Sequence, residues 1–111
     1  MKRLTLSLLG LLAVAVMSSA AAKQTFTGTI TDSVCDKADH SQMRMGPTDA
    51  ECAKACISDH GASYVLYDGK NAYTLSDQRT AEKFAAQKVN VVGALDAKTK
   101  IIQVDSITPA K

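Results

Sequence analysis

The side chains able to bind a metal ion or form a disulfide gather in one stretch, residues 35–60. This stretch holds every cysteine, both histidines and two of the four methionines of the chain. Thiolate, imidazole and thioether groups are ligands of transition metals, and two thiols can also oxidise to a disulfide. The specific chemistry of the protein is therefore expected here. The residues concerned are Cys35, His40, Met43, Met45, Cys52, Cys56 and His60.

The spacing of Cys52, Cys56 and His60 on a predicted helix indicates a possible metal site. Cys52 and Cys56 are four residues apart, so they share one helix face, and His60 follows one turn later. Cysteine and histidine ligands suit zinc, and thioethers extend the choice to copper(I). The candidate metal ligands are Cys35, His40, Cys52, Cys56 and His60, with Met43 and Met45 added for copper.

A disulfide is the main alternative, because only Cys52 and Cys56 form a close pair and zinc signatures carry two such pairs. A bridge from Cys35 to Cys52 or to Cys56 would fasten a loop to the helix and contribute about 3 kcal/mol. A bridge between Cys52 and Cys56 is disfavoured by the narrow geometry of disulfides. The stretch is thus interpreted as a disulfide staple or a metal site, with one cysteine left over in the disulfide case.

Catalysis is not expected. The rival function is a thiol-redox protein using Cys52 or Cys56, but a Cys-x-x-Cys motif is absent and both thiols lie inside the helix, away from its N-terminal amides. The sequence has no glycine-rich phosphate loop, His-Glu-x-x-His motif or nucleophile elbow. Nearby carboxylates, Asp32 among them, are interpreted as caps and solvated charges.

The first 22 residues predict a secretory signal peptide. Two basic residues precede an apolar run over residues 4–17, and small residues over 20–22 supply a cleavage site before Lys23. The apolar run is shorter than the roughly 20 residues of a membrane-spanning helix. A periplasmic or extracellular protein without a membrane anchor is expected, in a compartment where disulfides persist.

Removing those 22 residues from the 111 of the chain leaves 89, enough for a single domain over residues 23–111. Without Lys2 and Arg3, the chain has 11 basic and 11 acidic residues, so its formal net charge is zero. Proteins that bind nucleic acid through phosphate contacts carry a basic surplus. The balance argues against a nucleic-acid partner and leaves an unknown protein or a small ligand.

The remaining patterns predict five strands and two helices. Threonines alternate with Phe26, Gly28 and Ile30 in the first strand, where Gly28 suggests a bulge or a sharp coil. Thr48 and Glu51 form a capping box, and Gly61 is placed to end that helix. The expected strands cover residues 24–34, 64–67, 72–75, 89–95 and 101–107, and the expected helices cover 49–59 and 78–87.

The order β-α-β-β-α-β-β fits an OB-like β-barrel, which has five strands with a helix between the third and the fourth. The Cys/His-bearing loop and helix, at about residues 35–61, then form an insertion between the first two strands. An open five-stranded α+β sheet is the alternative. Tyr64, Tyr67 and Tyr73 lie in the central hairpin as candidates for stacking on a ligand, or as plain sheet packing.

The chain resembles a group of small exported bacterial proteins of uncharacterised function with an OB-like β-barrel domain. The resemblance lies in residues 27–35, 52–56, 61–66 and 89–95, and it covers most of the predicted mature chain. It implies the barrel and no particular activity. A weaker similarity, to exported bacterial OB-fold proteins without the cysteine-bearing insertion, implies a binding module.

Overall fold

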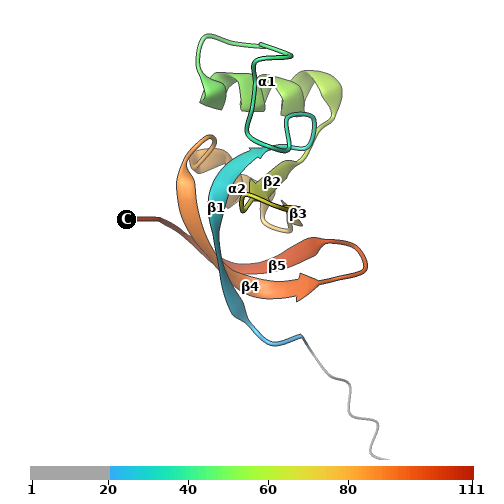
Figure 1. The fold of residues 1–111 in the computed structure, drawn as a ribbon, viewed down its shortest axis with the longest axis vertical. Coiled ribbons are helices and arrows are strands. Elements are labelled where there is room, and N and C mark those ends of the chain that lie inside the picture. The colour runs from blue at the N-terminus through green and yellow to red at the C-terminus, as the bar shows by residue number, and fades with distance from the viewer. Residues whose placement is uncertain (1–20) are drawn as a thin grey trace, which may run out of the picture.

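A computed structural model describes residues 21–111, so nearly all of the predicted signal peptide over residues 1–22 lies outside the described residues. The described chain is mainly β, with five strands and two helices in the predicted order (Figure 1). The elements are β1 (Gln24–Asp32), α1 (Asp49–His60), β2 (Tyr64–Tyr67), β3 (Ala72–Leu75), α2 (Gln78–Lys83), β4 (Lys88–Asp96) and β5 (Ile101–Pro109).

The strand pairings run in a ring, β1-β2-β3-β5-β4, with β4 pairing back to β1. All pairs are antiparallel except the short parallel contact of two residue pairs between β3 and β5. β1 serves two neighbours, since it pairs with β4 as far as Thr29 and with β2 from Thr29 onward. Near that change of partner, a Cβ on Gly28 would overlap the carbonyl oxygen of Tyr67. The expected special role of Gly28 is therefore explained by a close approach of two backbones.

The core lies inside the ring. Its largest fully buried members are aliphatic side chains contributed by all five strands: Ile30, Leu66, Leu75, Val89, Val91 and Ile102. In β5 the alternation is interrupted, because Val92 pairs with Ser106 while Gly93 pairs with Val104. Asp105 is the extra residue of this bulge. The bulge returns Ile107 to the interior, where it is 8% exposed.

α1 begins and ends as its capping residues predict, one residue later than expected at its C-terminus. The Thr48 hydroxyl accepts a hydrogen bond from the Glu51 amide, and Gly61 takes a left-handed conformation with φ of 63°. The Glu51 carboxylate accepts from the Thr48 hydroxyl at 3.3 Å instead of reaching the Thr48 amide. In Figure 1, α1 and the loop before it lie beyond the end of β1, at the top of the molecule.

α2 ends four residues before its predicted limit. The Ala86 amide donates to the Ile30 carbonyl at 2.8 Å, and the Ile30 amide donates to the Gln87 carbonyl at 3.0 Å. Ala86 has a φ of 64°, which turns the chain out of the helix. The prediction of a helix to residue 87 is therefore wrong, because hydrogen bonds to β1 replace the last helical turn.

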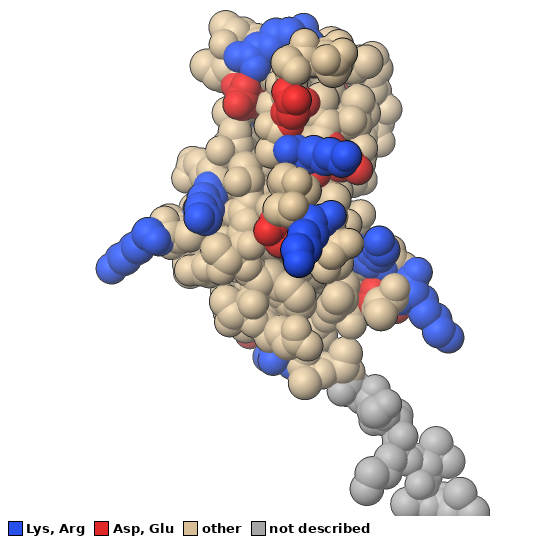
Figure 2. All heavy atoms as spheres, in the orientation of Figure 1, with Lys and Arg blue, Asp and Glu red and all other residues tan. Residues whose placement is uncertain are grey.

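Charged side chains are dispersed over the face seen in Figure 2. Lysine and arginine side chains occur at the top, the middle and the sides of this view, with carboxylates between them. On this face the basic groups do not form one continuous patch.

Candidate metal centre

Asp32, the last residue of β1, organises the turn that leads out of the sheet. Its Oδ1 accepts hydrogen bonds from the amides of Val34 at 2.9 Å and Cys35 at 2.8 Å. The Thr31 hydroxyl also donates to the Cys35 carbonyl at 2.7 Å. Thr31 and Asp32 thus both hold the backbone of Cys35 at the end of β1. Only one of the two Asp32 carboxylate oxygens is used in this way.

His40 returns to Asp32 from the loop that follows. Its side chain is 2% exposed, that of Asp32 is fully buried, and the distance from His40 Nδ1 to Asp32 Oδ2 is 3.9 Å. Among residues 21–111, these are the buried side-chain nitrogen and oxygen atoms that lack a hydrogen-bond partner. An unsatisfied buried polar atom costs about 1–3 kcal/mol. The two atoms face one another at the distance of an ion pair, and a cation bonded to both would satisfy them together.

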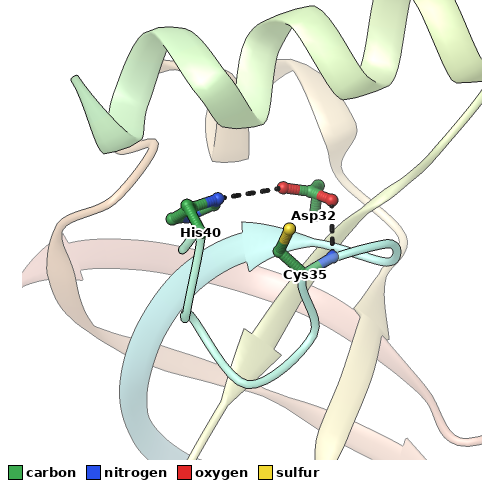
Figure 3. Close-up of side chains that lie close together, drawn as sticks. All are labelled: Asp32, Cys35 and His40. Atoms are coloured by element: carbon green, nitrogen blue, oxygen red, sulfur yellow. Dashed lines mark hydrogen bonds and ion pairs between the residues drawn. The ribbon is translucent and has the colours of Figure 1, made fainter. Parts of the chain in front are cut away.

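The thiol of Cys35 completes a compact group with these two side chains. One ligand atom from each of Asp32, Cys35 and His40 lies within 4.8 Å of the others, and all three residues are buried. Figure 3 shows the three side chains converging between the end of β1 and the helix that passes over them. We call these residues the Asp-Cys-His group.

A transition-metal ion fits the chemistry and spacing of this group. Carboxylate oxygen, thiolate sulfur and imidazole nitrogen are all zinc ligands at bond lengths of about 2.0–2.3 Å, which places neighbouring ligand atoms about 3.5 Å apart. The ligand atoms of the group lie within 4.8 Å of one another, and His40 Nδ1 lies 3.9 Å from Asp32 Oδ2. Small side-chain movements would bring them to the spacing around a metal ion. The group therefore has the ligand types and the proximity that a metal ion needs.

Burial and negative neighbours oppose ionisation of the thiols. Burial raises the pKa of Cys35, and the charges of Asp32 and Cys52 raise it further. Burial raises the pKa of Cys56 to about 11, with added contributions from Asp32, Cys52 and Cys35. A bound cation reverses this balance, since it stabilises the thiolate directly.

Four hydrogen bonds order the loop before α1, and three of them reach the helix. Arg44 donates to the carboxylate of Asp49 and to the Pro47 carbonyl. The Cys52 thiol lies between the Met43 carbonyl and the Met45 amide, at 3.3 Å from each. These contacts hold residues 43–45 of the loop against α1.

The remaining predicted ligands lie in different surroundings. His60 is the exposed last residue of α1, and Met43 is 41% exposed. Met45 is half-buried, whereas Cys52 and Cys56 are fully buried on the inner face of α1. The group of potential ligands thus joins Cys35 and His40 from the predicted set to Asp32.

No disulfide is formed among residues 21–111, which include all three cysteines. Cys35, Cys52 and Cys56 are free and buried. The bridge from Cys35 to Cys52 or Cys56 is therefore not seen in this structure, and it stays a prediction.

The three tyrosines proposed as ligand-stacking residues take part in packing. Tyr64 is 3% exposed, and Tyr73 packs against Phe26 with ring centroids 5.9 Å apart. The Tyr67 hydroxyl donates to the Gly69 carbonyl at 3.0 Å. Tyr64 also lines a shallow hollow between α1 and α2, beside Ile57.

Asp32 is the site residue that sequence reasoning assigned to another role. It does act as a cap, as expected for such carboxylates, but its second oxygen faces His40. Its position three residues before Cys35, at the end of an alternating strand, is the signal that could have identified it.

A cavity of about 340 Å³ opens beside the site, with Cys35 in its wall. Val34 and Met43, the large hydrophobic residues that are exposed in the described chain, also line it. Of the Asp-Cys-His group, only Cys35 lines this cavity.

None of the helices in residues 21–111 combines the length and apolar character needed to span a membrane. Comparisons with protein-family models, with curated proteins and with solved structures gave no match to this chain.

Proposed function

We propose that the protein is an exported, non-catalytic binding module whose ligand is a transition-metal ion held by the Asp-Cys-His group. The observation that carries this proposal is the pair of buried, unpartnered atoms, Asp32 Oδ2 and His40 Nδ1, that face one another beside the Cys35 thiol. A cation bonded to both would remove two unsatisfied polar atoms at once. Zinc and copper are the metals that this ligand chemistry favours.

The scaffold in this proposal is an OB-like barrel that carries the site where the end of β1 meets the loop-helix insertion. The ring of strand pairings and the helix between β3 and β4 support the OB-like assignment. The signal-like N-terminus supports a periplasmic or extracellular location. The balanced charge supports a small ligand or a protein partner over nucleic acid.

A thiol-redox or nucleophilic function has less support. Cysteine, histidine and aspartate also form nucleophilic triads, but reactive cysteines have a lowered pKa. Here the pKa values of Cys35 and Cys56 are raised, by burial first and then by Asp32. The three ligand atoms also converge on one point, an arrangement that suits coordination of a single ion.

Metal titration of matched histidine variants tests the proposal. The chain has two histidines, of which His40 is buried in the site and His60 is exposed at the end of α1. We expect the reduced wild-type protein and His60→Gln to bind one zinc ion each, measured by calorimetry and metal analysis. For His40→Gln the affinity should fall by more than the 10- to 100-fold that loss of an outer-shell partner typically causes.

Equal affinity of the wild type and His40→Gln would contradict the proposal, as would the absence of zinc and copper binding by the reduced wild type. Circular dichroism of each apo variant serves as the control, because a folded His40→Gln protein links the lost affinity to the missing ligand.

A further inference from the structure

A hollow of about 220 Å³ lies between α1 and α2 and shares no residue with the Asp-Cys-His group. Residues of both helices line it, together with Tyr64 at the start of β2. Pockets for drug-sized ligands measure about 300–1,000 Å³, whereas a water molecule takes up about 30 Å³ in the liquid. The volume of the hollow therefore suits a small organic molecule.

The ring of Tyr64 is anchored in the core, but its hydroxyl has no partner. Tyr64 is 3% exposed, and its hydrogen bonds run from its backbone to the side chain of Gln78. Within residues 21–111 the buried side-chain atoms without a partner are Asp32 Oδ2 and His40 Nδ1, so the unpartnered Tyr64 hydroxyl is reached by solvent. It is reached where Tyr64 lines the hollow. A tyrosine this buried usually finds a partner for its hydroxyl, which points to a ligand here.

The Tyr64 hydroxyl is held in place as a hydrogen-bond donor before any ligand binds. Gln78 Oε1 accepts from the Tyr64 amide at 2.7 Å, and Gln78 Nε2 donates to the Tyr64 carbonyl at 2.9 Å. These bonds join the start of β2 to α2. Burial raises the pKa of Tyr64, and the charges of Glu82 and Asp32 raise it further. The hydroxyl therefore keeps its proton at neutral pH.

Charged side chains of both signs line the same hollow. Lys54 comes from α1, whereas Arg79 and Glu82 come from α2. All three are exposed, and none of them forms an ion pair within the described part of the chain. Ile57 adds apolar surface beside Tyr64. A ligand with a carboxylate alone would meet Glu82, and a ligand with an ammonium group alone would meet two cations, so the lining is complementary to a zwitterion.

We propose that this hollow binds a small aliphatic amino acid as its zwitterion. The carboxylate of the ligand pairs with Lys54 and Arg79 and accepts a hydrogen bond from the Tyr64 hydroxyl. The ammonium group pairs with Glu82, and the aliphatic side chain lies against Ile57. The site is separate from the proposed metal site, so failure of either proposal leaves the other standing.

Titration with L-leucine, followed by nuclear magnetic resonance of the backbone amides, tests the proposal. We expect saturable shifts at the residues of the hollow in the millimolar range of leucine. Tyr64→Phe keeps the ring in the core and removes the hydroxyl, so leucine should bind about tenfold more weakly, as expected for loss of a hydrogen bond to a charged group. Tyr67→Phe is the matched control, because the Tyr67 hydroxyl is bonded to the Gly69 carbonyl outside the hollow, and it should bind leucine like the wild type.

Two analogues of leucine separate the contributions of its charges. Isocaproate lacks the ammonium group and leucinamide lacks the carboxylate, and both should bind more weakly than leucine. Glu82→Gln should weaken the binding of leucine but not that of isocaproate. Absence of shifts at the hollow in millimolar leucine, or equal affinity of Tyr64→Phe and the wild type, would overturn the proposal. Equal binding of leucine and isocaproate would overturn the zwitterion and indicate a site for an anion.

Discussion

At the residue scale, the two oxygens of Asp32 separate the structural and the binding roles of one side chain. Oδ1 holds the turn through the amides of Val34 and Cys35, whereas Oδ2 faces His40 without a hydrogen-bond partner. A substitution that keeps the first oxygen and changes the second can therefore distinguish the two roles.

Asp32→Asn is expected to abolish tight zinc binding without loss of apo stability. The asparagine Oδ1 can still accept from both amides, and its NH₂ group can donate toward His40 Nδ1 in place of the unpartnered oxygen. We expect an apo protein that is as stable as the wild type or more stable by up to about 1 kcal/mol. Urea unfolding of the apo proteins and zinc titration measure the two effects.

Asp36→Asn is the matched control, because Asp36 lies exposed in the same loop and acts on the Cys35 thiol less than Asp32 does, so both quantities should change little. An apo Asp32→Asn protein that is destabilised by several kcal/mol would show that the charge of Asp32 holds the turn, against this interpretation.

At the element scale, α1 depends on a cap placed directly after the loop. The Thr48 hydroxyl accepts a hydrogen bond from the Glu51 amide at 3.2 Å. This bond caps the start of the helix that carries Cys52 and Cys56. Thr48→Ala should destabilise the protein by about 1 kcal/mol, as loss of an N-cap does. Chemical denaturation measures this change, and Ser58→Ala, an exposed substitution later in α1, should be nearly neutral. Equal stability of Thr48→Ala and the wild type would show that packing alone fixes the start of α1.

Gln78 is the first residue of α2. Its side-chain amide hydrogen-bonds to the backbones of β2 and β3 just beyond their last paired residues, Val65 and Thr74. Its Oε1 accepts from the Tyr64 amide at 2.7 Å, and its Nε2 donates to the carbonyls of Tyr64 at 2.9 Å and Leu75 at 2.7 Å. α2 is thereby bonded to the start of β2 and the end of β3.

Gln78→Ala should cost about 1–3 kcal/mol, because three partly buried backbone groups lose their partners. Gln78→Glu restores the acceptor but places a carboxylate against two carbonyl oxygens, so it should not rescue the loss at neutral pH. Thermal unfolding of both variants checks the prediction. Full rescue by glutamate would mean that only the bond to the Tyr64 amide contributes.

At the scale of the whole molecule, the ring depends on β1 changing its pairing partner. Gly28 lies at this change, and a side chain there would meet the backbone of Tyr67. Gly28→Ala should destabilise the fold by at least the roughly 1–3 kcal/mol typical of overpacking, since a backbone atom cannot rotate away.

Thr25→Ala, an exposed substitution in the same strand, is the control for Gly28→Ala. Denaturant titration measures both variants. A neutral Gly28→Ala result would mean that β1 and β2 can separate locally at no cost, against the close approach seen between them.

Local interactions made much of the fold predictable from sequence. The strands, their order and α1 follow from alternation, turn residues and the Thr48 and Gly61 caps, all of which act between residues near in sequence. The end of α2 did not follow, because Ala86 and Gln87 bond to Ile30, more than fifty residues earlier. The bulge at Asp105 likewise depends on the register between β4 and β5, two strands paired over nearly their whole length.

For the candidate site, the sequence by itself determined which potential ligands are available. Three cysteines and two histidines lie in one stretch, and Cys35 and His40 are among the predicted ligands. Only the tertiary structure decided which of them meet. It added Asp32 to the group, left His60 at the surface, and placed the Cys52 thiol between the backbones of Met43 and Met45. The physical reason is that spacing fixes which side chains share a helix face, whereas burial and the path of the loop fix what that face contacts.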